Sequence, residues 1–205
     1  MLAPADCPAV ILASGSAARA RLLAGAGLAF TVVPALVDEA ELRNALRAEE
    51  LLAEDAAVAL AEMKAAHVAA RAPAAAIVLG SDQILELEGE WLKKPADRAA
   101  ARAQLLRLRG RRHRLVSAVV AFRAGRRVWY DVDAAVLTVR PFGDAFLDDY
   151  FDAAGEAVLG CVGAYQLEGL GAQLMTRVEG AYPTVLGMPL LPLLQFLRDQ
   201  GALAT

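Results

Sequence analysis

The chain has 205 residues, of which 57% are hydrophobic and 22% are charged. This composition is typical of a folded protein with a large core, and it excludes disordered, collagen-like and coiled-coil chains. The formal net charge of −3 does not provide the broad basic face that nucleic-acid binding usually requires, so we expect no nucleic-acid partner.

Membrane insertion and secretion are both disfavoured. A spanning helix needs about 18 uninterrupted apolar residues, and the two best stretches are broken by Arg19 and Arg21 and by Pro189 and Pro192. The first ten residues lack the basic region and apolar core of a signal peptide. The chain has 2 cysteines, without metal-ligand spacing, which favours reduced thiols over a single disulfide. We therefore expect a cytoplasmic protein that does not contact membranes.

The first part of the chain alternates short apolar strands with helices. Strands are predicted at Val10–Ala13, Ala29–Val33 and Ile77–Leu79. A helix is predicted to follow Ser14–Ser16 and end near Gly27, and a long helix is predicted from a cap at Asp55 to about Arg71.

The second part introduces antiparallel pairing. We expect hairpins over 84–92 and over 112–123 with 127–139, helices over 98–110, 143–153 and 189–200, a glycine-rich stretch over 155–171, and a strand over 174–178. Alternating strands and helices followed by hairpins favour an α/β fold with a mixed sheet over an α+β fold.

A phosphate site is one interpretation of the first strand–helix junction. Ser14, Gly15 and Ser16 lead into a helix that carries Arg19 on its first turn. Backbone N–H groups and the positive end of the helix dipole favour an anion there. The alternative is an ordinary serine N-cap.

Carboxylates and lysines mark further candidates. Asp82 follows a predicted buried strand, where α/β proteins commonly bind ligands, and Asp38-Glu39 is a second acidic segment. Only 3 of the 21 basic residues are lysines (Lys64, Lys93 and Lys94). A compact ammonium suits a phosphate oxygen, although each of these residues is equally compatible with a solvated surface.

Taken in order, these segments resemble the Maf family of nucleoside triphosphate pyrophosphatases. The match covers nearly the whole chain and consists of Leu12-Ala13-Ser14-Gly15-Ser16-Ala17-Ala18-Arg19-Ala20-Arg21-Leu22-Leu23, Phe30 with Asp38-Glu39, Leu60-Ala61-Glu62-Met63-Lys64-Ala65, Gly80-Ser81-Asp82-Gln83, Lys94-Pro95 with Asp97, Gly163-Ala164-Tyr165, and Val185-Leu186-Gly187-Met188-Pro189-Leu190. Each motif is weak alone, but the ordered set is specific.

The resemblance implies one domain over 1–205 with two lobes, a central cleft and a mixed twisted sheet flanked by helices, similar to inosine triphosphate pyrophosphatases. It implies hydrolysis of a nucleotide substrate to the monophosphate and pyrophosphate with Mg²⁺ or Mn²⁺, and it is compatible with a homodimer. The catalytic residues implied are Asp82, Glu39, Lys64 and Lys94. Asp82 would be the general base, Glu39 and Asp82 the metal ligands, and the lysines with Ser14, Ser16 and Arg19 would offset the charge of the triphosphate.

Three positions that differ between family subgroups carry Ala18, Gln83 and Glu168. Gln83 and Glu168 match the family's 7-methyl-GTP subgroup, so the resemblance implies 7-methyl-GTP or a related modified nucleotide as substrate. A carboxylate at 168 can accept both N1–H and N2–H₂ of guanine. Ala18 departs from that subgroup, which has tryptophan there, and Ala17 departs from the family's proline. The alternatives are a dTTP/UTP pyrophosphatase and a nucleotide-binding regulator of septum formation without turnover.

Overall fold

The computed structural model describes residues 7–204, so the segment examined for a leader peptide lies mostly outside it. The chain divides into two compact units. Unit 1 comprises residues 1–83, 117–133 and 186–205, and unit 2 comprises residues 84–116 and 134–185. No helix among the described residues is long and apolar enough to cross a membrane.

The strands form one mixed sheet, which confirms the predicted α/β fold class. They are β1 (Val10–Leu12), β2 (Thr31–Val32), β3 (Ile77–Leu87), β4 (Glu90–Leu92), β5 (Arg112–Arg123), β6 (Arg126–Val139) and β7 (Met175–Glu179). The strand order is β2-β1-β3-β5-β6-β7, with β4 paired to β3. β1 is parallel to β2 and β3, whereas the pairs β3–β4 and β6–β7 are antiparallel.

The helices are distributed over both units. They are α1 (Ala17–Gly25), α2 (Glu39–Ala48), α3 (Ala53–Ala69), α4 (Arg98–Leu108), α5 (Asp144–Ala154), α6 (Tyr182–Val185) and α7 (Leu190–Asp199). Three 3-10 segments lie in the predicted glycine-rich stretch: η1 (Gly155–Gly160), η2 (Val162–Ala164) and η3 (Leu170–Leu174).

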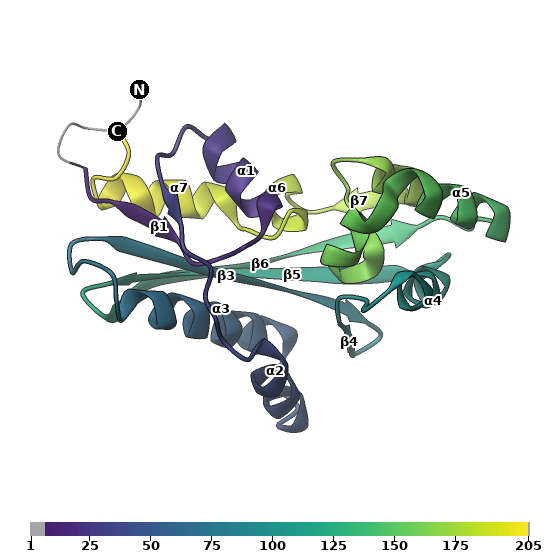
Figure 1. Cartoon of the computed structure of the whole chain (residues 1–205), viewed down its shortest axis with the longest axis horizontal. Helices are drawn as coiled ribbons and strands as arrows, with labels where there is room; N and C mark the ends of the chain where they lie inside the picture. The colour runs from purple at the N-terminus through teal and green to yellow at the C-terminus, as the bar shows by residue number, and fades with distance from the viewer. Residues whose placement is uncertain (1–6, 205) are drawn as a thin grey trace. The chain divides into compact units, whose positions relative to one another are not determined.

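In unit 1, helices cover both faces of the sheet. α1 and α7 lie on one face and α3 lies on the other (Figure 1). Leu23 of α1 and Leu193 of α7 join Leu79 of β3 in one fully buried cluster. Coverage on both sides explains why the start of β3 is continuously apolar rather than alternating, as expected for a strand buried on both faces.

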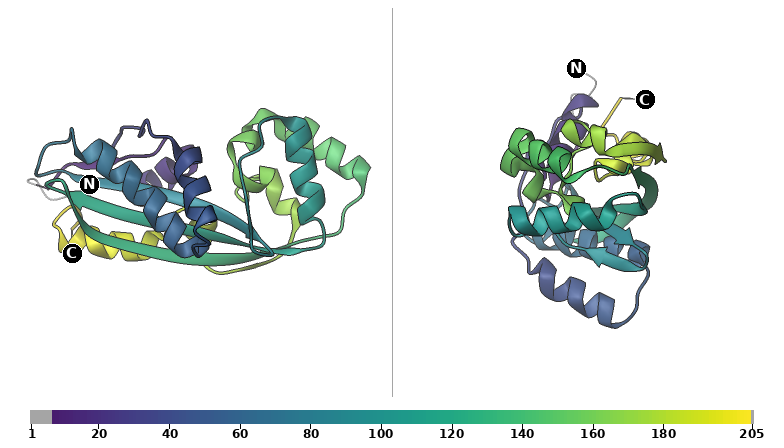
Figure 2. Two further views of the ribbon diagram at one scale, coloured as in Figure 1. Left: turned by 90° about the horizontal axis from the view of Figure 1, so that it is seen from below. Right: turned by 90° about the vertical axis from the view of Figure 1, so that its right-hand side faces the viewer.

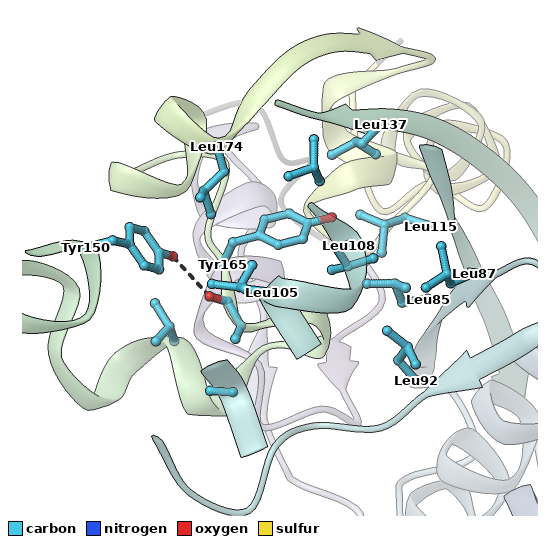
Figure 3. Close-up of a cluster of buried hydrophobic side chains, with 14 of the residues drawn as sticks. Leu85, Leu87, Leu92, Leu105, Leu108, Leu115, Leu137, Tyr150, Tyr165 and Leu174 are labelled. Carbon is cyan, nitrogen blue, oxygen red and sulfur yellow. Dashed lines mark hydrogen bonds between the residues drawn. The ribbon is translucent and has the colours of Figure 1, made fainter. Parts of the chain in front are cut away.

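Unit 2 has its own apolar core, in which α4 packs against η1 and η2 and α5 packs against η1 (Figure 2). Leucines of β3, α4 and β5 surround the ring of Tyr165 in this core (Figure 3). The hydroxyl of Tyr150 donates a 3.0 Å hydrogen bond to the carbonyl of Ala164. The imidazole Nε2 of buried His113 lies 2.6 Å from the hydroxyl of Tyr165. These bonds satisfy polar atoms that burial would otherwise leave without water.

Two local predictions were wrong, and α2 was missed. The strand predicted to end at Leu79 continues to Leu87, so Asp82 lies within β3 rather than after it. The long helix begins at Ala53 after an N-cap at Leu52, which places Asp55 in its first turn. Residues 39–48, which the sequence analysis left without structure, form α2, with Asp38 as its N-cap.

Most other elements are confirmed. Ser16 caps α1, accepting a hydrogen bond from the backbone N–H of Arg19. Asp97 caps α4 in the same way through the N–H of Ala100. Both cysteines are free thiols, as expected.

Candidate active site

Three of the predicted catalytic side chains meet in unit 1. The ammonium of Lys64, on α3, lies 2.5 Å from Asp82 Oδ1 on β3 and 3.0 Å from Glu39 Oε2 at the start of α2. The Lys64 and Asp82 side chains are 8% and 5% exposed, whereas Glu39 is 41% exposed. A buried charge pair of this kind is costly to desolvate. Removing one partner strongly destabilises the protein, because the other charge is left buried without a counter-charge.

A close helix–strand contact places Lys64 beside Asp82. A Cβ atom on Gly80 would lie 2.1 Å from the carbonyl oxygen of Ala61 and 2.7 Å from the backbone nitrogen of Ala65. No side chain fits there, so the backbone of β3 approaches α3 as closely as it does only because residue 80 is glycine. Ala61 and Ala65, both fully buried, supply the small surface on the helix side.

Arg43, which the sequence analysis did not single out, completes the cluster. Its Nη2 donates to Asp82 Oδ2 at 3.1 Å, so the two oxygens of Asp82 contact cations from two different helices. Arg43 follows Glu39 by four residues on α2, and this spacing puts both side chains on the same helical face. The i, i+4 spacing of Glu39 and Arg43 is a signal only on a helix, and the sequence patterns did not predict α2.

The start of α1 lies close to the same strand. Arg19 is buried, and its guanidinium donates to Ser14 Oγ at 3.1 Å, to the carbonyl of Ser81 at 2.9 Å and to the carbonyl of Gly187 at 2.9 Å. Gly187 has φ of +101°, a left-handed conformation that glycine adopts without strain. These contacts tie three segments of unit 1 together, and a contact of Arg19 with phosphate stays a prediction.

The charge of Arg19 is partly offset by its surroundings. Burial lowers the pKa of Arg19, and the negative charges of Asp82 and Glu39 act in the opposite direction. Because arginine ordinarily titrates far above neutral pH, the group remains a cation near the carboxylates.

The predicted base-reading positions are divided between the units. Gln83, in unit 1, donates from its side-chain Nε2 to Ser117 Oγ at 3.0 Å. Ala18 is half-buried on α1. Glu168 is an exposed residue of unit 2. Lys94, which was predicted to bind phosphate, is also an exposed residue of unit 2. Their roles therefore remain predictions from the sequence.

The donor set suits a hard divalent cation that shares its coordination with a substrate. Within residues 7–204 no group of three or more His, Cys, Asp or Glu side chains is placed to hold a metal alone. Glu39 and Asp82 do converge, since both contact the same ammonium. Mg²⁺ commonly uses one or two carboxylates together with phosphate oxygens and water, so the residues present fit such an ion.

Comparison with known proteins finds a family match over nearly the whole chain. The family model described as "Maf-like protein" matches residues 9–200. The chain belongs to the Maf family. A relative from Paramagnetospirillum magneticum, named nucleoside triphosphate pyrophosphatase, is 56% identical over 193 residues, covering 94% of this chain and 99% of its own length.

Other Maf relatives are similar along nearly their full length. A nucleoside triphosphate pyrophosphatase from Rhodospirillum rubrum is 48% identical, covering 96% of each chain. A protein from Rhizobium meliloti, named 7-methyl-GTP pyrophosphatase, is 47% identical and covers 96% of this chain and 98% of its own. The resemblance to the Maf family identified from the sequence is thus confirmed.

Proposed function

We propose that this chain is a nucleoside triphosphate pyrophosphatase with its reaction centre at Asp82, Lys64 and Glu39. The observation that carries the proposal is a buried carboxylate held between cations, in a chain of the Maf family. The substrate of this reaction is a triphosphate, and its negative charge must be stabilised by cations within hydrogen-bond distance.

The reaction divides into proton transfer and charge stabilisation. A water oxygen attacks the α-phosphorus, the bond to the oxygen bridging the α- and β-phosphates breaks, and pyrophosphate leaves with that oxygen. Asp82 accepts the proton of the attacking water, which requires one of its lone pairs to face the water. Lys64 binds phosphate oxygens and offsets their charge. The family resemblance gives the same role to Lys94.

Mg²⁺ or Mn²⁺ would be held by Glu39 and Asp82. When bound, such an ion neutralises phosphate charge and polarises the oxygens that develop charge in the transition state. Lys64 already touches both carboxylates, so it holds their oxygens in orientation.

The test is direct. Purified protein is incubated with Mg²⁺ or Mn²⁺ and a panel of nucleoside triphosphates, and pyrophosphate and orthophosphate are assayed separately. We expect pyrophosphate release that Asp82→Asn abolishes and that Asp55→Asn preserves, because Asp55 is an exposed acid on α3. Nucleotide binding without turnover in the unaltered chain would support the alternative, a regulator of septum formation.

For the substrate we propose 7-methyl-GTP or a related modified purine nucleotide. The acceptor-only carboxylate of Glu168 suits the adjacent donors of guanine, and one relative carries that substrate in its name. Glu168→Gln should lower the preference for 7-methyl-GTP over dTTP by about tenfold. The exposed Glu156 of the same unit gives the matched control Glu156→Gln.

A preference of the unaltered chain for dTTP or UTP would overturn the substrate proposal and leave the reaction standing. A homodimer and a cytoplasmic location remain predictions from the sequence.

A further inference from the structure

Arg43 lies beside the proposed base, and none of the proposed reaction steps uses it. It lies on α2, one turn after Glu39, and its side chain is 12% exposed. Its Nη2 bonds Asp82 Oδ2 at 3.1 Å, while Lys64 bonds Asp82 Oδ1 at 2.5 Å. The plane of the Asp82 carboxylate is therefore fixed from both sides.

The second terminal nitrogen of Arg43 has no such role. Nη1 is buried and has no hydrogen-bond partner within the described part of the chain. A buried cationic donor without an acceptor is costly, and such groups in native structures call for an explanation such as a catalytic or ligand-binding role. The acceptor that matches a guanidinium is an oxyanion.

We propose that Arg43 is a substrate-binding residue, with Nη2 holding Asp82 and Nη1 binding an oxygen of the triphosphate. The proposal rests on the function proposed above and deepens it. Because both nitrogens belong to one planar group, a phosphate oxygen bound at Nη1 is held at a fixed distance from the carboxylate that takes the proton. The same arginine thus sets the spacing between base and substrate, which is worth much of the rate in reactions of this kind.

Replacing Arg43 by lysine distinguishes a role in holding Asp82 from a role in binding phosphate. Arg43→Lys keeps one cation on α2 that can contact Asp82, but a single ammonium lacks the forked geometry that reaches two acceptors at once. A residue that only braced Asp82 would tolerate this change. A residue that also binds phosphate would not.

The first measurement is the affinity for inorganic tripolyphosphate with Mg²⁺, by calorimetry. This probe has no nucleobase and reports binding whether or not the chain turns over nucleotides. We expect Arg43→Lys and Arg43→Gln to bind about tenfold to a hundredfold more weakly than the unaltered chain. Arg47, exposed one turn further along α2, gives the control Arg47→Gln, which should bind normally.

The second measurement repeats Arg43→Lys in the Asp82→Asn background. If Arg43 binds phosphate itself, its loss weakens tripolyphosphate binding in both backgrounds. If Arg43 acts only through Asp82, the effect disappears once the carboxylate is gone, and the proposal is overturned. Unfolding midpoints in urea identify any variant whose fold has changed, and Arg43→Gln replaces Arg43→Lys in the comparison if the lysine variant is one of them.

The outcomes keep the two proposals apart. Unchanged tripolyphosphate affinity in both Arg43 variants overturns the role of Arg43, even when the unaltered chain releases pyrophosphate from nucleotides. Affinity that is weakened both in those variants and in the Asp82→Asn background supports the role of Arg43, even when no nucleotide is hydrolysed.

Discussion

Replacing Gly80 by alanine should disturb both the stability of unit 1 and the geometry of its reaction centre. The added Cβ would lie 2.1 Å from the Ala61 carbonyl oxygen, whereas real Cβ atoms stay at least 3.0 Å away. The helix backbone must therefore withdraw from the strand by about 0.9 Å. Overpacking of this kind typically costs about 1–3 kcal/mol.

The same displacement affects Lys64, because α3 carries it. The ammonium now lies 2.5 Å from Asp82 Oδ1, and a shift near 1 Å at a reaction centre can reduce turnover by about a hundredfold. We therefore expect Gly80→Ala to lower the free energy of unfolding by about 2 kcal/mol and pyrophosphate release by at least about tenfold.

Urea denaturation and the pyrophosphate assay measure the two effects. Gly25→Ala is the matched control, since nothing lies within 4 Å of a Cβ at that position. The reasoning would be refuted by a Gly80→Ala chain that unfolds at the same urea concentration as Gly25→Ala and retains full turnover.

Two further predictions concern protonation and metal. Burial lowers the pKa of His113 to about 4, from an ordinary value of 6.5, so the unfolded chain takes up the proton first as the pH falls. Protonation of His113 in the unfolded chain should therefore lower the free energy of unfolding by about 2 kcal/mol between pH 7.5 and pH 5. In urea titrations at the two pH values, the free energy of unfolding of His113→Gln should fall by about that much less than that of the unaltered chain. An equal fall in both chains would contradict this. Glu39→Gln should raise the Mn²⁺ concentration for half-maximal activity at least about tenfold, and an unchanged metal titration would exclude Glu39 as a ligand.

The sequence predicted the fold class and most elements, because the apolar runs and caps are strong local signals. It missed α2, whose only buried residue is Leu46 and whose other positions are mostly charged residues and alanines. It also ended β3 at Leu79, since glycine and aspartate are disfavoured in strands. There the tertiary contact with α3 determines the structure: Gly80 is needed for close packing, and Asp82 is stabilised by its cations.

The site was predictable in its residue types but not in its pairing. Lys64, Asp82 and Glu39 were identified from the family resemblance, and only the packing of α3 on β3 brings the first two into contact. Arg43 was beyond reach, because its importance depends on a helix that local patterns did not reveal. Arg19 was identified as a cation for phosphate, yet its guanidinium donates hydrogen bonds to Ser14 and to two backbone carbonyls.

The path of the chain through the two units has a consequence for biosynthesis. Unit 1 is assembled from three separate stretches, and its core includes Met188, Leu193 and Phe196 of the third stretch. A ribosome therefore synthesises every residue of unit 2 before it makes the segment that closes the core of unit 1. The reaction centre, although all its members precede residue 84, is enclosed by a complete core only after α7 emerges. Nascent chains stalled before residue 186 should for this reason remain sensitive to protease across residues 10–80, although most of the polypeptide has already been synthesised.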